Sequence, residues 1–75
     1  MKRFYILTTY VEDIFLGFFD DVEKLKTAIS NCLDEVHIYV YNTTENGIVK
    51  VDEIDFIDED FTEKIEKLEK EDKNV

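Results

Sequence analysis

Two short apolar runs open the chain. Residues 3–11, RFYILTTYV, are rich in aromatic and β-branched side chains, which is typical of a β-strand. Residues 14–19, IFLGFF, form a second run of strand length after a polar interruption. The two runs are predicted to pair as a hairpin. Its loop should be longer than two residues, because Glu12-Asp13 lacks the glycine that the tightest turns prefer.

The hydrophobic period then changes from two to that of a helix. In DDVEKLKTAISNCL, residues 20–33, one face collects Val22, Leu25, Ile29 and either Cys32 or Leu33. Asp20 followed three residues later by Glu23 is a variant of the capping box, which marks the amino end of a helix.

A second hairpin is predicted from residues 36–44, VHIYVYNTT, and residues 48–54, IVKVDEI. Asn46-Gly47 between them suits a two-residue type I′ turn, because both residues tolerate positive φ. This turn would set the cross-strand pairs, which would be Tyr41 with Asp52 and Tyr39 with Ile54.

A last helix is predicted over residues of about 60–71, followed by a frayed tail at 72–75. Phe61, Ile65 and Leu68 form a narrow apolar stripe at helical spacing. Acid-before-base pairs four residues apart support the helix: Asp60–Lys64, Glu63–Lys67 and Glu66–Lys70.

The predicted order is therefore β-β-α-β-β-α in a single domain, residues 1–75. The natural layer solution is an α+β fold with a four-stranded, mainly antiparallel sheet and two helices. In the first hairpin both faces of the sheet carry apolar side chains, which is unusual for a sheet with one solvated face. Either helices cover both faces, or a partner covers one.

Charge changes this picture at the carboxyl end. DEIDFIDEDFTEKIEKLEKEDKNV, residues 52–75, holds eleven carboxylates and four lysines, a net of −7 out of −10 for the chain. Acids at the start of the last helix are favoured by its dipole, which explains part of this excess. The run before the helix has no such explanation. It is either a solubilising surface or a surface for a positively charged partner.

The net charge of −10 disfavours direct binding to nucleic acid or to an anionic membrane. The basic and apolar start is too short and too interrupted for a signal peptide, and no segment reaches membrane-spanning length. Cys32, the single cysteine, cannot form an internal disulfide. These features predict a cytoplasmic protein.

Residues for chemistry are few. His37 has no second His or Cys near it in sequence, and Cys32 fits a small core residue better than a nucleophile. DEIDFIDEDFTE lacks the glycine of a calcium-binding loop and places Ile54 and Phe56 where ligands should be. We therefore expect no metal, no cofactor and no enzymatic activity.

Two sets of residues are candidates for binding a partner. The acidic set comprises Asp52, Glu53, Asp55, Asp58, Glu59, Asp60 and Glu63. The aromatic set, for a partner or for a homodimer, comprises Tyr5, Tyr10, Phe15, Phe18, Tyr39 and Tyr41. Strand composition alone is the alternative explanation of the tyrosines.

The segment FYILTTYVEDIFLGFFDDVEKLKTAIS resembles a pattern found in small proteins of bacteriophages and Gram-positive bacteria. A glycine-aromatic strand, here residues 16–19, leads into an acidic cap at Asp20 and an amphipathic helix, here residues 22–29. The resemblance implies this β-β-α fold type. The small, acidic, proline-free chain is also similar to phage proteins that inhibit host defence, anti-CRISPR proteins among them.

We therefore expect a protein–protein interaction module, encoded by a phage, that blocks a host or defence protein carrying a basic patch. Its acids could do so by mimicking nucleic acid. The alternative is a homo-oligomeric assembly protein that buries an apolar face of its sheet.

Overall fold

The structure is a computed structural model that describes residues 2–32 and 35–73. Its elements follow the predicted order: β1 (Lys2–Thr9), β2 (Phe15–Phe19), α1 (Val22–Asn31), β3 (Val36–Thr44), β4 (Gly47–Asp55) and α2 (Phe61–Lys73). The four strands form one antiparallel sheet in the order β2-β1-β3-β4. The predicted α+β fold is confirmed.

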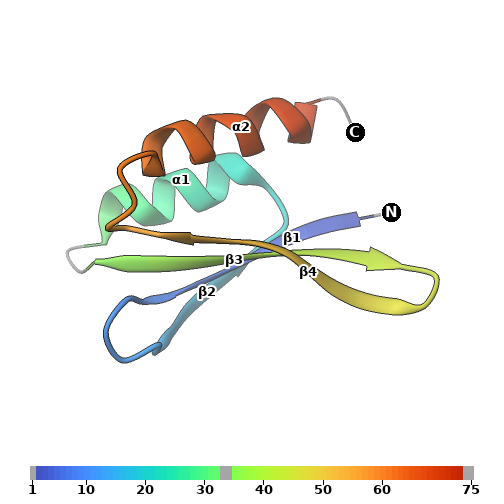
Figure 1. Cartoon of the computed structure of the whole chain (residues 1–75), viewed down its shortest axis with the longest axis horizontal. Helices are drawn as coiled ribbons and strands as arrows, with labels where there is room; N and C mark the ends of the chain where they lie inside the picture. The colour runs from blue at the N-terminus through green and yellow to red at the C-terminus, as the bar shows by residue number, and fades with distance from the viewer. Residues whose placement is uncertain (1, 33–34, 74–75) are drawn as a thin grey trace.

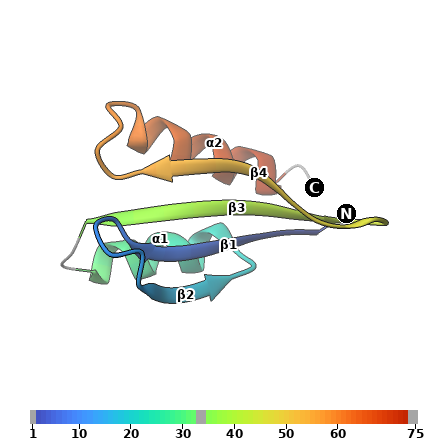
Figure 2. The same ribbon diagram turned by 60° about the horizontal axis from the view of Figure 1, so that its bottom comes forward.

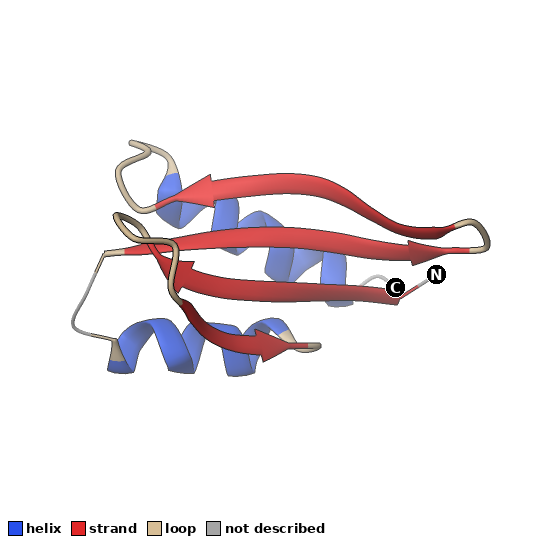
Figure 3. Cartoon of the chain, turned by 90° about the horizontal axis from the view of Figure 1, so that it is seen from below, coloured by secondary structure: helices blue, strands red, loops and turns tan. Residues whose placement is uncertain are grey.

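Both helices lie on the same face of the sheet (Figure 1). α1 packs against β1 and β2, α2 packs against β4, and the two helices contact each other. Seen from below, all four strands lie in front of the helices (Figure 3). The second sheet face is therefore not covered by any element of the described chain. We call it the open face.

The core lies between the helices and the sheet. Because side chains alternate along a strand, every second residue of β1 and β3 points to this covered face. The buried apolar residues are Tyr5, Leu7, Val22, Leu25, Val36, Ile38, Val40, Ile54, Ile65 and Leu68. Phe19, Ala28, Ile29, Cys32 and Phe61 pack against them from the margin. Cys32 is thus a packing residue.

The amino end of α1 differs from the prediction by one residue. Asp21, and not Asp20, is the N-cap: its side chain accepts a hydrogen bond of 2.7 Å from the backbone N–H of Glu23. Asp20 instead forms an ion pair of 3.7 Å with Lys24. At the other end α1 stops at Asn31, and Leu33 lies outside the described residues.

The register of the β3–β4 hairpin also differs from the prediction. Thr44 pairs with Gly47, so the two turn residues are Glu45 and Asn46, and Gly47 follows them with φ of 128°. A β-bulge then follows at Val51, which lies between Lys50, the partner of Tyr41, and Asp52, the partner of Val40. As a result Tyr39 lies opposite Glu53 and Tyr41 opposite Lys50. The end of this hairpin projects beyond both helices (Figure 2).

Helix α2 begins at Phe61, one residue after the predicted start near residue 60, and extends through Lys73. The predicted frayed tail is thus helical at residues 72 and 73, while residues 74–75 lie outside the described part. Of the predicted pairs along α2, Asp60 and Lys64 lie within 3.8 Å. Lys26 of α1 bonds Glu69 of α2 at 3.0 Å and links the two helices.

Candidate functional site

The open face is an aromatic surface. Partners across an antiparallel ladder point to the same side of a sheet, so the cross-strand pairs show which side chains share this face. It carries Phe4, Ile6 and Thr8 from β1, Phe15 and Phe18 from β2, His37, Tyr39 and Tyr41 from β3, and Lys50, Glu53 and Asp55 from β4. Phe15 and Phe18 are 62% and 57% exposed, although both are large apolar side chains.

The aromatic rings form a connected stripe across three strands. The ring centroids of Phe4 and Phe18 are 5.0 Å apart, and those of Phe4 and Tyr41 are 5.3 Å apart in a stacked arrangement. His37 and Tyr39 are in contact at 4.4 Å. Such contacts hold the rings in fixed positions, so the stripe is a preorganised surface.

One row crosses all four strands: Phe18 (β2), Ile6 (β1), Tyr39 (β3) and Glu53 (β4) are successive cross-strand neighbours. The row is apolar at the β2 edge and acidic at the β4 edge. The row thus places Phe18 and Tyr39 of the predicted aromatic set and Glu53 of the predicted acidic set on one surface.

The aromatic set needs one correction. Tyr5 is fully buried in the core, on the face that the helices cover, so it is not available to a partner. Its alternation partners on β1, Phe4 and Ile6, are the residues that reach the open face. Sequence reasoning missed both, because either face of an all-apolar strand could have been the covered one.

Tyr39 is held in place by the loop between β1 and β2. Its hydroxyl donates a hydrogen bond of 3.0 Å to Oδ1 of Asp13, which also accepts one of 2.9 Å from the Thr8 hydroxyl. Asp13 has φ of 55°, a left-handed conformation that Asp tolerates better than most residues. The hydrogen bond to the Asp13 carboxylate raises the pKa of Tyr39 to about 12, with smaller contributions from burial and charge.

We expect the phenol of Tyr39 to stay protonated at pH 11, where an ordinary tyrosine is mostly ionised. Because the folded-state pKa is raised, this bond contributes stability below pH 10 that is lost as the pH rises from 10 to about 12. NMR titration of the Tyr39 ring measures this. Asp13→Asn should move the pKa back toward 10, and the neighbouring Glu12→Gln should not. Titration of Tyr39 near 10 in the wild-type protein would contradict the bond.

The single histidine also lies on the open face. His37 Nδ1 contacts Oδ1 of Asp55, and its Nε2 lies 3.9 Å from Oε1 of Glu53. The His37 side chain is only 15% exposed. These contacts surround the imidazole with two carboxylates and the Tyr39 ring, which gives it a structural role in the polar half of the open face.

The acidic set does not lie on one surface. Glu53 and Asp55 lie on the open face. Asp52 lies on the other side and lines a groove under α2, which Asp60 and Glu63 also line. Asp58 and Asp60 both pair with Lys64, at 3.2 and 3.8 Å. The remaining two, Glu59 and Glu63, are exposed at the start of α2 and in the loop before it.

Bonds to Asp58 order the loop before α2. Its carboxylate accepts hydrogen bonds from the backbone N–H of Asp55 and from Lys64, and these lower the pKa of Asp58. Part of the acidic run therefore has a structural task, which is to fix the connection between β4 and α2.

Further acids join the run in three dimensions. The β1–β2 loop, the start of β3 and the β4–α2 loop all lie at one end of the molecule (Figure 1). Tyr10, beside Val11 and Glu12 in that loop, donates its backbone N–H to the carbonyl of Glu35, which ties the β1–β2 loop to the start of β3. This end thus gathers Glu12, Asp13, Glu35, Asp55, Asp58, Glu59 and Asp60. We call it the acidic end. Glu12, Asp13, Glu35 and Asp55 lie next to the ends of the predicted strands, and this placement was the sequence signal that could have indicated the acidic end.

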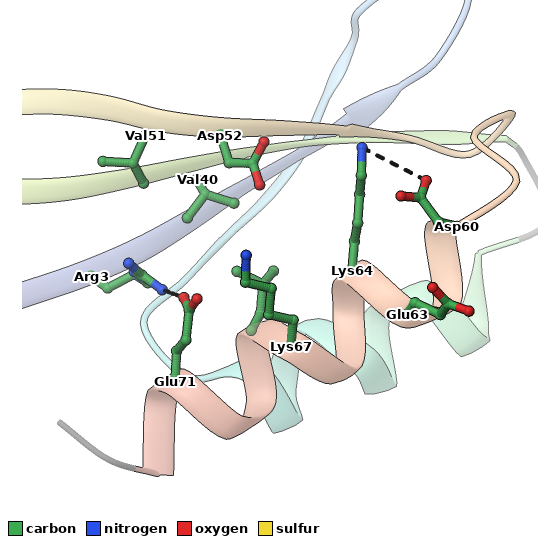
Figure 4. A pocket seen from close by; sticks show the side chains of 10 residues that line it. Arg3, Val40, Val51, Asp52, Asp60, Glu63, Lys64, Lys67 and Glu71 are labelled. Carbon is green, nitrogen blue, oxygen red and sulfur yellow. Dashed lines mark hydrogen bonds and ion pairs between the residues drawn. The ribbon is translucent and has the colours of Figure 1, made fainter.

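A groove of 480 Å³ lies between the sheet and α2. Figure 4 shows Lys67 pointing into it, with Arg3 bonded to Glu71 at one end and Lys64 to Asp60 at the other. Because most of its charged groups already pair with each other, the groove offers few groups to a ligand. Among residues 2–32 and 35–73, no group of three or more His, Cys, Asp and Glu residues is arranged to hold a metal ion.

Comparisons with known proteins assign no family. No protein-family model matches the chain, and no curated protein or solved structure matches it significantly. No helix in the described part of the chain is long and apolar enough to span a membrane.

Proposed function

We propose that this protein is a non-enzymatic interaction module that binds a basic protein through the open face and blocks the surface that it covers. The row from Phe18 to Glu53 is the observation that supports this most. Aromatic side chains supply the buried anchor of many interfaces, and carboxylates at the edge of the patch steer a positively charged partner. The acidic end would add to this steering, because the chain as a whole carries −10.

The partner class follows from charge and from the resemblance. A patch bordered by Asp13, Glu53 and Asp55 selects Lys- and Arg-rich surfaces and rejects acidic ones. Similarity to small acidic phage proteins supports a host or defence protein as the target, with the host cytoplasm as the place of action.

Two neighbouring acids on β4 provide a matched test. Glu53 lies on the open face, whereas Asp52 lies on the groove side, and each neutralisation changes the net charge by one. In affinity capture from a host extract, Glu53→Gln should weaken retention of the specific partner several-fold, and Asp52→Asn should leave it nearly unchanged.

An apolar pair of variants completes the experiment. Phe18→Ser on the open face should abolish capture. Val49→Ser, which is also half-exposed but paired with Asn42 on the other face, should not. Circular dichroism must show that each variant is folded. Equal effects of the two substitutions in either pair would rule out the open face as the binding surface.

Nucleic-acid mimicry is a narrower version of the proposal, supported by the gathering of carboxylates at the acidic end. It requires binding that weakens steeply with salt, as phosphate contacts do. Lys64 neutralises part of this end by pairing with Asp58 and Asp60, so the aromatic open face has the stronger geometric support.

A homo-oligomer that buries the open face is the second candidate, supported by the same uncovered aromatic stripe. Charge opposes it, because two copies would bring −20 together. Sedimentation at high and low salt distinguishes the cases: a strict monomer in both excludes the oligomer.

A further inference from the structure

Lys50 marks a place on the open face that holds a cation. Its ammonium group donates a hydrogen bond of 2.9 Å to Oε1 of Glu53 and lies 5.9 Å from the centroid of the Tyr39 ring. A carboxylate beside an aromatic face is a favourable environment for an ammonium or guanidinium group. The side chains of Lys50 and Glu53 are 47% and 45% exposed, so solvent and a partner can reach this place.

We propose that Tyr39 and Glu53 form a recognition subsite for an arginine side chain of the partner, and that Lys50 occupies this subsite in the free protein. The inference rests on the proposed function. It adds the chemical group that is recognised and its position on the open face.

Several contacts fix the subsite before a partner arrives. The Asp13 carboxylate holds the Tyr39 hydroxyl, and the His37 ring packs against the Tyr39 ring at 4.4 Å. Glu53 lies directly across the ladder from Tyr39. An arginine guanidinium can stack on the ring and bond the carboxylate at the same time, since it is planar and presents a fork of donors.

The Lys50 side chain can leave the subsite without a large loss of folding stability. A half-exposed ammonium returns to water easily, and an exposed ion pair of this kind contributes little to stability. An incoming arginine brings a group that stacks better than an ammonium and is less strongly hydrated. Lys50 would thus act as an internal competitor that limits the affinity for weakly basic surfaces.

The neighbouring row positions give the partner's contact an orientation. Ile6 and Phe18 continue the row from Tyr39 toward the β2 edge. A partner surface that fits would carry an apolar side chain beside its arginine, spaced to meet the apolar half of the row. The same surface turned around would set an apolar group against Glu53 and is disfavoured.

The test uses N-acetyl-arginine methylamide as the probe, titrated into isotope-labelled protein and followed by NMR. The neutral isostere is N-acetyl-citrulline methylamide. Lys50→Gln removes the internal competitor, and Lys24→Gln, on α1 behind the sheet, makes the same change in net charge. We expect the arginine probe to bind Lys50→Gln about threefold to tenfold more tightly than Lys24→Gln.

The perturbed signals should centre on Tyr39 and Glu53, and the citrulline probe should leave them unchanged. Adding Glu53→Gln to Lys50→Gln should remove the gain in affinity. Equal affinities of the two lysine variants would overturn the subsite, and so would perturbations centred on the loop at Asp58.

This experiment can fail separately from the capture experiment. If Phe18→Ser abolishes capture but the arginine probe binds Lys50→Gln no more tightly than Lys24→Gln, the open face binds a partner without this subsite. If the probe binds as expected but neither Phe18→Ser nor Glu53→Gln affects capture, the subsite exists and the proposed function is wrong.

Discussion

Ile38→Ala should destabilise the protein by about 2–5 kcal/mol, because it removes most of a fully buried side chain from a small core. Ile38 lies on the covered face of β3, between Leu7 of β1 and Ile54 of β4. The walls of the resulting cavity are strands held in a ladder, so they cannot collapse easily. A small domain has a total stability near the lower end of about 5–15 kcal/mol, so the loss is a large fraction.

Urea denaturation followed by circular dichroism measures this loss as a lower midpoint with an unchanged slope. Ile48→Ala is the matched control, with the same chemical change on the adjacent strand. Ile48 is 64% exposed at the projecting end of the hairpin, so its truncation should stay within about 0.5 kcal/mol of wild type. Equal losses at the two isoleucines would contradict a core confined to the covered face.

Gly47→Ala is expected to cost about 1–3 kcal/mol through the backbone alone. Gly47 has φ of 128°, a conformation that residues with a side chain rarely adopt, and a Cβ there would meet no atom within 4 Å. The cost is therefore strain in the turn and not a clash. It should appear as a lower melting temperature, together with weaker hydrogen-exchange protection at the end of the β3–β4 hairpin.

Asn46→Ala separates the observed turn from the type I′ turn that the sequence suggested. In a type I′ turn at Asn46-Gly47 both residues need positive φ, so both alanine variants would be strained. In the observed turn only Gly47 has positive φ, and Asn46→Ala should be nearly neutral. A comparable loss of stability in both variants would favour the type I′ register.

This register decides which acids reach the open face. The expected pairing of Tyr39 with Ile54 would have put Ile54 and Asp52 beside the tyrosines. The observed pairs, including Ile38 with Ile54, turn Ile54 into the core and bring Glu53 beside Tyr39. A shift of one residue exchanges the two faces of a strand. Because Ile54 is buried in the core, its neighbour Glu53 must point to the open face, where it forms the proposed subsite with Tyr39.

Local patterns in the sequence were sufficient to predict the order of the strands and helices. Changes of hydrophobic period at Asp20 and after residue 33, and the Asn-Gly pair, separate the strands and helices within one or two residues of their observed bounds. These signals depend on neighbours in the chain, which is why they can be read without a fold. The position of the α1 cap was missed by one residue, because Asp20 and Asp21 are equally good caps by composition.

The site depended on contacts between distant segments. Both faces of the β1–β2 hairpin are apolar, so only the placement of α1 and α2 showed that Tyr5 is in the core and that Phe4 and Ile6 lie outside it. Likewise, only the sheet order brought Glu12, Asp13 and Glu35 to the same end as the acids of residues 55–60.

The sequence by itself determined the strands, the helices and the excess of negative charge, because composition and period act over a few residues. The tertiary structure alone decided which sheet face is open and which carboxylate lies beside Tyr39. Those features depend on helix packing and strand register, which are set by burying the most apolar surface across the whole chain.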